Sequence, residues 1–358
     1  MACALIRQPL VVLLLGAMGL FSVPGTPLAG SRAVALPSID DSTISPRVLY
    51  IENPRFPRVT DAELATIVQT AAGLVKEHFG ITLEAPSSIK RTDIDDIFSD
   101  LAPKASRKLG RVIGDFRNGE VDWARVKGLL IEQIESHGDS LDAQIAFAAP
   151  YLTASPSSDS LDAFADALVE AYRTRLAYWT TATLDDGYPI IGKVPGREDL
   201  PLNEYVYWAL MAKLGVEAEI ILTNQLVASV EYIPTPIHSA IRGGISGGSS
   251  EYNPNSRYGA SVWVSVAPFL MDDGQVTDLR DGKTYRREDA LQYAGVLLAH
   301  EIGHQILHLG HPWSNEACLM RPAEVLDFEA WSEQLDADQC PIGSDAEMTP
   351  GVLKIPVW

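Results

Sequence analysis

The segment His300-Glu301-Ile302-Gly303-His304 constrains this chain more than any other feature. In an α-helix, residues four apart lie one turn above each other on the same face. The two imidazoles can therefore bind one metal ion together. Glu301 then lies close enough to act on a water molecule there without being a ligand itself. We predict a helix over 287–309 that binds one Zn²⁺, with His300 and His304 as ligands and Glu301 as the general base.

A catalytic zinc usually has three protein ligands, with water in the fourth position. His308 continues the histidine spacing, but its Cα would lie about 12 Å along the helix axis from that of His300. Three imidazoles on one straight helix therefore cannot converge on one ion. Gly310 can close the helix and Pro312 prevents its continuation. This favours His311, between those two residues, as the third ligand, and leaves His308 as an alternative.

The segment 317–322, Ala-Cys-Leu-Met-Arg-Pro, follows at a short distance. The HExxH motif, a glycine, a third histidine and this segment together resemble the metzincin zinc endopeptidases. In that family a glycine lets the chain bend to a third histidine, and a methionine-containing turn passes beneath the metal. The resemblance implies that Met320 supports the zinc site without ligating it. It also implies a twisted mixed β-sheet and an active-site helix.

The specific resemblance covers 300–322 and departs from the family pattern HExxHxxGxxH at two positions. Leu307 stands at the glycine position and Gly310 at the third-histidine position, so that His311 is displaced by one residue. A second kind of zinc peptidase, similar to thermolysin, takes its third ligand from a glutamate on the next helix. Glu324, twenty residues after His304, is the corresponding alternative.

The N-terminus has the pattern of a secretory signal peptide. Arg7 precedes an apolar run over 10–21 that is short for a membrane span, and small residues follow. We predict a signal peptide over 1–33, a leader or linker over 34–46, and a secreted or periplasmic protein that does not bind membranes after cleavage. An uncleaved N-terminal anchor is the alternative reading.

Two cysteines, Cys318 and Cys340, remain after the predicted cleavage. In an exported protein they predict one disulfide, which would contribute about 3 kcal/mol in the chain-entropy model. The net charge of −19 and the lack of a basic stripe argue against nucleic acid as a partner. A peptide or protein substrate is the partner that we expect.

The metzincin resemblance, together with the order of the predicted elements, implies an α+β fold with one zinc peptidase domain over 47–358, and the polar breaks between helical segments predict a mostly helical insertion at about 86–200. Strands are predicted at 48–51, 81–83, 217–223 and 261–266, and the last of these is expected to be an edge strand that pairs with extended substrate. A capping box at Thr60 and Glu63 starts a helix that Gly80 ends. Further helices are predicted at 104–115, 122–136, 139–149, 160–178, 202–214 and 322–335.

These features predict a peptidase in which Glu301 assists the attack of a zinc-bound water on a peptide carbonyl. Tyr285, Tyr293 and Arg321 are candidate donors to the oxyanion because they lie near the motif in the sequence. The alternative is an exported zinc-containing binding or structural protein without turnover. The presence of Glu301 argues against that alternative, because a structural zinc site needs no general base.

Overall fold

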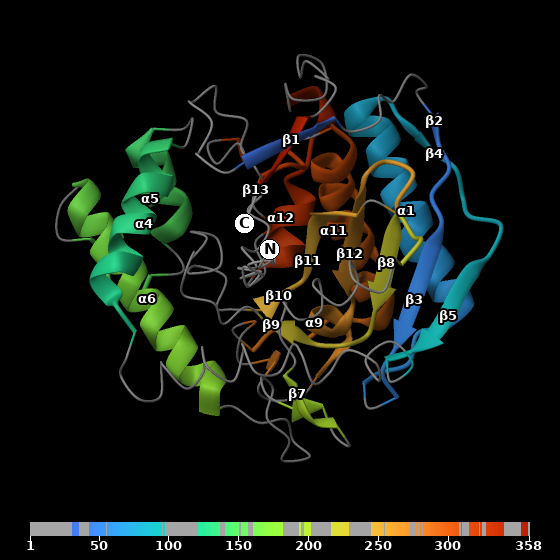
Figure 1. Ribbon diagram of the computed structural model, residues 1–358, viewed down its shortest axis with the longest axis horizontal. Helices are drawn as coiled ribbons and strands as arrows, with labels where there is room; N and C mark the ends of the chain where they lie inside the picture. Colours follow the sequence, from blue (N-terminus) through green and yellow to red (C-terminus); the bar gives the residue numbers. More distant parts are fainter. Residues whose placement is uncertain are drawn as a thin grey trace, which may run out of the picture.

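A computed structural model of the full chain describes residues 31–35, 43–54, 56–94, 96, 121–136, 140–149, 152–156, 160–181, 193–194, 197–201, 216–228, 245–253, 255–272, 276–277, 280, 282–307, 309, 315–321, 323, 327–339 and 352–356. These residues form helices and a mixed β-sheet (Figure 1). The general α+β character predicted from the sequence is therefore found.

The central sheet has five strands in the order β11-β12-β8-β3-β5. Four of them run parallel, and β11 pairs antiparallel with β12 at one edge. All residues of β8 and β12 are buried, as expected for inner strands of a sheet that is covered on both faces. The strands are β3 (Val48–Glu52), β5 (Ile89–Asp93), β8 (Ile220–Thr223), β11 (Gly248–Tyr252) and β12 (Ala260–Ser265).

Helices α1 (Asp61–Phe79) and α11 (Arg287–Leu307) pack together and against one face of this sheet (Figure 1). They approach closely at Gly295, where a Cβ atom would lie 2.5 Å from the Cβ of Thr70. Beside this contact, the Thr70 hydroxyl donates a hydrogen bond of 2.7 Å to Gln292. The core between helices and sheet includes Tyr50, Leu64, Ile67, Val75, Leu222, Val262, Val264, Leu298 and Ile302.

The predicted boundaries of α1 are confirmed. The Thr60 side chain accepts a hydrogen bond from the Glu63 backbone, and the Glu63 carboxylate accepts one from the Thr60 backbone, as in a capping box. Gly80 closes the helix in the left-handed region, with φ of 72°. Glu63 also pairs with Arg287, so the N-terminus of α1 is tied to that of α11.

The Glu63–Arg287 pair should make the unfolding free energy depend on pH in the acid range. Hydrogen bonds from Arg287 and Thr60 lower the pKa of Glu63 from 4.5 to about 2. Its contribution to stability is therefore complete above about pH 4.5 and is lost as the pH falls towards 2. We expect Glu63→Gln to lower the unfolding free energy at pH 6 and to lose less of it on acidification than the wild type does. Urea unfolding at pH 6, 4 and 3 measures this, with Glu77→Gln, an exposed position on the same helix, as control. Parallel acid curves for wild type and Glu63→Gln would contradict it.

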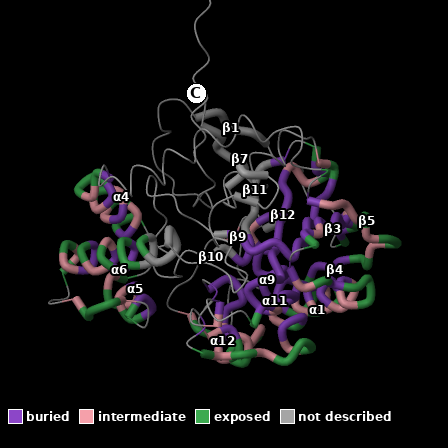
Figure 2. Tube along the Cα trace, turned by 90° about the horizontal axis from the view of Figure 1, so that it is seen from below, coloured by how far each residue is buried: buried purple, intermediate pink, exposed green. Residues whose placement is uncertain are grey.

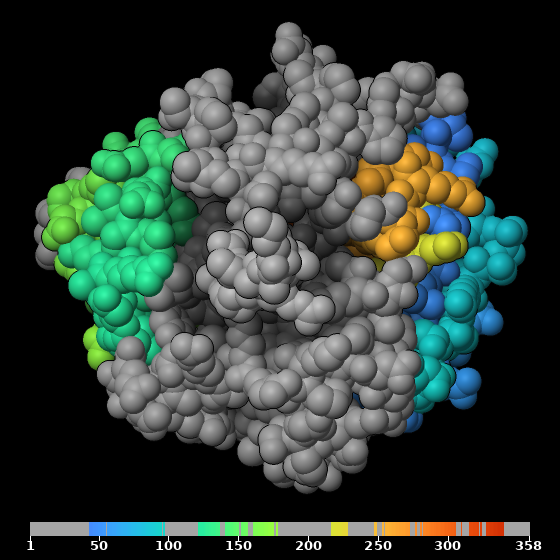
Figure 3. All heavy atoms as spheres, in the orientation of Figure 1, coloured from blue at the N-terminus to red at the C-terminus, as the bar shows by residue number. Residues whose placement is uncertain are grey.

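A separate group of helices has its own apolar core, and we call it the helical module. It consists of α4 (Trp123–Ser136), α5 (Leu141–Ala148) and α6 (Leu161–Thr181), which lie to one side of the sheet (Figures 2 and 3). Lys127 on α4 pairs with Asp162 and Asp166 on α6 at 2.9 and 2.6 Å. These helices lie within three residues of the predicted bounds. The buried side chains of the module are Val121, Val126, Leu130, Ile134, Phe147, Ala148, Phe164, Ala165 and Leu168.

Two predicted boundaries differ from the structure. Strand β5 pairs with β3 at one edge of the central sheet, so residues 89–93 belong to the sheet and the predicted insertion start at 86 is too early. The predicted linker 34–46 is too long, because Thr43–Ile44 (β2) pairs with Thr82–Leu83 (β4) and Ile44 belongs to the core. The helices predicted at 104–115 and 202–214, and most of the predicted signal peptide, lie outside the described residues.

The predicted last helix is shorter than expected. It begins at Phe328, where Asp327 caps its N-terminus, and ends at Glu333 (α12). No helix in the described part of the chain is long and apolar enough to cross a membrane. The remaining elements are β1 (Ser31–Ala35) paired with β13 (Val352–Pro356), β6 (Lys193–Val194) with β7 (Arg197–Pro201), β9 (Val227–Ala228) with β10 (Ile245–Ser246), helix α9 (Ala267–Leu270) and a 3₁₀ turn at Ala337–Gln339.

Candidate metal centre

The motif helix predicted from the sequence is α11, and its C-terminal end is fixed to the sheet. Gln305, the residue after His304, is buried and donates hydrogen bonds to the backbone carbonyls of Glu219 and Ala260. These carbonyls lie where the chain enters β8 and β12. The end of α11 that carries the histidines is therefore held at the N-terminal ends of two inner strands.

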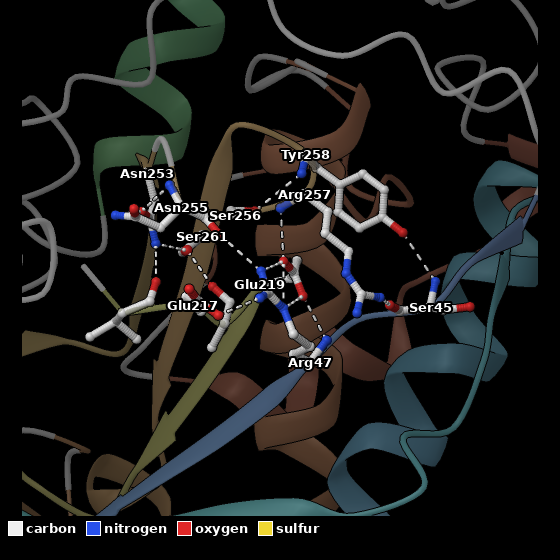
Figure 4. A network of polar contacts seen from close by, with 12 residues as sticks. Ser45, Arg47, Glu217, Glu219, Asn253, Asn255, Ser256, Arg257, Tyr258 and Ser261 are labelled. Carbon is white, nitrogen blue, oxygen red and sulfur yellow. Dashed lines mark hydrogen bonds and ion pairs between the residues drawn. The ribbon is translucent and has the colours of Figure 1, made fainter.

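An ion pair between a buried carboxylate and a partly exposed arginine fixes the same end of β8. The Glu219 carboxylate, 1% exposed, accepts hydrogen bonds from the Arg47 backbone and guanidinium, both at 2.6 Å, and from the Arg257 backbone at 2.8 Å (Figure 4). Burial raises the pKa of this carboxyl group, but the hydrogen bonds from Arg47 and Arg257 outweigh burial and lower it. Glu219 thus stays charged, and its backbone carbonyl is held in place for Gln305.

The two motif histidines point their Nε2 atoms towards each other, while each Nδ1 atom lies next to a backbone carbonyl. The Nδ1 atom of His300 lies 2.7 Å from the Leu319 carbonyl, and that of His304 lies 2.6 Å from the Leu309 carbonyl. Because a carbonyl only accepts, each Nδ1 carries the hydrogen, and in the neutral ring Nε2 has a lone pair. The two Nε2 atoms are 3.1 Å apart, and the rings stand at 90°.

This arrangement passes a test of fit to zinc. Two nitrogens bound to Zn²⁺ at 2.0–2.1 Å in tetrahedral geometry lie about 3.3 Å apart. The observed 3.1 Å between the two Nε2 atoms is close to that value. Two Nε2 lone pairs facing each other repel unless a proton or a cation lies between them. Hydrogen bonding of Nδ1 to a carbonyl is also the usual way in which proteins orient zinc-binding histidines.

The chain turns back directly after the motif. Helix α11 ends at Leu307, two residues before the predicted end, and the Leu309 N–H lies 3.4 Å from the Gly303 carbonyl. This contact places Leu309, beyond the helix, next to a carbonyl in its last turns. The Leu309 carbonyl thereby reaches His304. The bend predicted at Gly310 and His311 lies outside the described residues and stays a prediction.

Glu301 is buried beneath the edge strand of the sheet. Its side chain is 5% exposed and lies against Gly248 in β11. A Cβ atom at Gly248 would lie 3.0 Å from Cγ and 3.1 Å from Oε1 of Glu301, so glycine allows the strand to approach the carboxylate. The strand predicted at 261–266 is wrong as an edge, because β12 pairs with β11 on one side and with β8 on the other. Among the described strands, β11 is the edge on this side.

The turn around Met320 lies against the motif helix. Met320 is fully buried, and its sulfur occupies the space where a Cβ atom of Gly303 would project. Phe79, from the end of α1, lies 3.0 Å from the same point. The preceding residue, Leu319, provides the carbonyl that holds His300. The methionine turn is therefore in contact with both the motif helix and one of its histidines.

We expect Gly303→Ala to lower the unfolding free energy by about 1–3 kcal/mol, because the added methyl group would overlap with Met320. Gly73→Ala is the matched control, since Gly73 lies inside α1 and a methyl group added there would have nothing within 4 Å of it. That change should raise stability by about 0.5–1 kcal/mol. Chemical unfolding measures both. Equal effects of the two substitutions would contradict the described packing of Met320.

The three candidate oxyanion donors make other contacts. The Tyr285 ring lies 5.0 Å from the Arg280 guanidinium and 4.9 Å from the ring of Tyr293. Burial and nearby carboxylates raise the pKa of Tyr293 to about 12. The Arg321 guanidinium lies 4.8 Å above the ring of Phe147, in the helical module. These contacts give all three residues packing roles.

Sequence reasoning missed two aromatic residues beside the motif. Trp331 on α12 is fully buried, and its ring centroid lies 6.1 Å from that of His300. Phe328, one turn earlier, packs against Trp331 at 4.9 Å. The available signal was two large aromatic residues three apart in a short helix after the methionine turn, which places both on one face.

Several predicted site residues lie outside the described residues: His308, His311, Glu324 and Cys340. In the part that the structure does describe, no group of three or more histidine, cysteine, aspartate or glutamate side chains is placed to hold a metal ion. Cys318 is fully buried and disulfide-bonded. Its pairing with Cys340 stays a prediction, because the second cysteine is not among the described residues.

Comparison with protein families, curated proteins and solved structures finds no match. The proposal for function therefore rests on the geometry of this site.

Proposed function

We propose that this protein is a secreted or periplasmic zinc-dependent peptidase with a metzincin-like catalytic domain. One observation carries the proposal: the Nε2 atoms of His300 and His304 face each other at 3.1 Å, while each Nδ1 is held by a backbone carbonyl. Glu301, on the same helix turn, is buried beside them. The contact of Met320 with Gly303 supports the likeness to metzincins.

His300, His304 and His311 are the residues that would hold one Zn²⁺. When bound, zinc supplies a Lewis acid that lowers the pKa of water towards ~7 and stabilises negative charge on the substrate carbonyl oxygen. The carbonyls of Leu319 and Leu309 keep both described imidazoles in one tautomer and one orientation. No reorientation of these two rings is then needed for binding.

Glu301 is the proposed general base. Its carboxylate takes a proton from the attacking water and passes it to the leaving amine as the peptide bond breaks. Burial against the backbone of Gly248 limits the access of bulk water to this carboxylate.

The edge strand β11 is the proposed site of substrate binding. Its partner β12 pairs with one side of β11, and the other side has no neighbouring strand among the described residues. An extended peptide can add to such an edge through backbone hydrogen bonds. Because Gly248 in β11 touches Glu301, a peptide paired there would lie next to the proposed base.

The third ligand can be identified by substitution. We expect His311→Ala to weaken zinc binding by more than about a hundredfold, since a zinc site rarely keeps its affinity with two protein ligands. Glu324→Gln and His308→Ala should change the zinc dissociation constant by less than threefold. Competition with a chromophoric chelator measures all three. Loss of zinc from Glu324→Gln alone would instead assign the carboxylate alternative that resembles thermolysin.

Cleavage of a peptide library, read by mass spectrometry, tests the proposed activity. The protein should cut peptides, lose this activity to a chelator and regain it on addition of Zn²⁺. A protein that binds one zinc and cuts nothing after removal of the predicted signal and leader would contradict the peptidase. That outcome would favour the alternative, an exported zinc-containing binding or structural protein.

A further inference from the structure

We infer that the helical module positions the methionine turn, and through it His300, by the contact of Phe147 with Arg321. This inference rests on the proposed function, because His300 is there a zinc ligand. It assigns Arg321 as a positioning residue, and it gives the module a role in forming the metal site.

The contact is short and buried. The Arg321 guanidinium carbon lies 4.8 Å from the centre of the Phe147 ring, and both residues are at most 6% exposed. Cation–π contacts are strongest where water is excluded. Phe147 lies at the end of α5 and belongs to the apolar core of the module, together with Phe164 and Leu168. The module thus holds Phe147 in place, and among the described contacts of the module it is the Phe147 ring that meets Arg321.

Three consecutive residues connect this contact to the motif. Leu319 accepts the hydrogen bond from His300 Nδ1, Met320 fills the space beside Gly303, and Arg321 carries the contact with the module. A displacement of Arg321 thus acts on the residues that orient the His300 ring. Arg321 also pairs with Glu316 at 4.0 Å, but the Glu316 side chain is 71% exposed, so this pair holds Arg321 weakly.

The turn itself is locally stiff. The Arg321 N–H donates to the Cys318 carbonyl at 3.0 Å, and the Cys318 N–H donates to the Asn315 carbonyl at 3.2 Å. Cys318 is disulfide-bonded, and the Ala317 carbonyl accepts a hydrogen bond from Asp336. Because these bonds hold the turn in one conformation, a displacement of Arg321 is expected to displace Leu319 as well.

Two matched phenylalanine substitutions test the inference. Phe147→Leu removes the aromatic face beneath Arg321, whereas Phe164→Leu makes the same change elsewhere in the module core. We expect Phe147→Leu to raise the zinc dissociation constant by about threefold to thirtyfold, the range of a buried cation–π contact. Phe164→Leu should change it less than twofold, even where it lowers the stability of the module.

Arg321 variants and a metal-free measurement complete the test. Arg321→Lys, which keeps a cation over the ring, should weaken zinc binding less than Arg321→Leu, and adding Phe147→Leu to Arg321→Leu should cause little further loss. In the zinc-free full-length protein, with ¹⁵N-labelled histidine, Phe147→Leu should shift the His300 ring resonances and Phe164→Leu should not. A wild type that binds no zinc would overturn the proposed function, while the His300 resonances would still decide the inference. Equal effects of Phe147→Leu and Phe164→Leu, or unchanged His300 resonances in both variants, would overturn the inference that the module positions His300.

Discussion

Replacing Glu301 by glutamine should lower kcat for peptide hydrolysis by about 10³-fold and leave zinc bound. A positioned general base typically contributes 10²–10⁴-fold, and an amide cannot take the proton from the attacking water. The substitution is nearly isosteric, so the side chain still fills its place beside Gly248. The variant should therefore stay folded, which chemical unfolding checks.

The measurement is steady-state cleavage of one library-derived peptide, together with metal analysis of the purified protein. Glu288→Gln is the matched control, because Glu288 lies on the same helix, exposed in its first turn. It should retain full activity. If Glu301→Gln kept wild-type kcat, Glu301 would not be the base, and the proposed mechanism would be wrong even for a zinc-containing protein.

The second large effect is expected at His304. His304→Gln replaces the imidazole, whose Nε2 lone pair faces His300, by an amide, which is a poor ligand for zinc. We expect the zinc dissociation constant to rise by more than about a hundredfold. A loss of that size is a modest part of the roughly 10–16 kcal/mol of binding free energy that a zinc site supplies. Peptidase activity should fall below detection at zinc concentrations that saturate the wild type.

His78→Gln provides the control for His304→Gln. His78 is buried at the end of α1, where burial lowers its pKa, and it makes no described contact with the two motif histidines. This variant can lose stability but should bind zinc with wild-type affinity. If both variants kept their zinc, the metal would be bound elsewhere in the chain, and the facing Nε2 atoms would have another explanation.

Features that depend on residues close together in the chain could be predicted from the sequence. Thr60, Glu63 and Gly80 act through neighbours at most four residues away, so the boundaries of α1 followed from capping rules. The same holds for α11, where the histidine spacing fixes which side chains share a face. The prediction that His300 and His304 would meet needed helix geometry alone.

Features that depend on partners far away in the chain could not be predicted from the sequence. Whether β12 is an edge or an inner strand depends on the pairing of β11, and a continuous apolar run is the same in both cases until that pairing is known. Gln305 gave no signal, because its partners are backbone carbonyls 86 and 45 residues away. The contact of Phe147 with Arg321 joins two regions whose side-chain patterns are independent of each other.

The close packing of α1 against α11 has a consequence for biosynthesis. Thr70 and Gln292, which meet at this contact, are 222 residues apart. At the usual 5–20 residues per second, α1 would leave the ribosome roughly 10–45 s before its partner helix. During this interval α1 lacks the helix that covers most of its apolar face, so we expect the nascent chain to depend on a chaperone or on export in an unfolded state. The proposed zinc site, formed by the later helix, would be assembled among the last parts of the molecule.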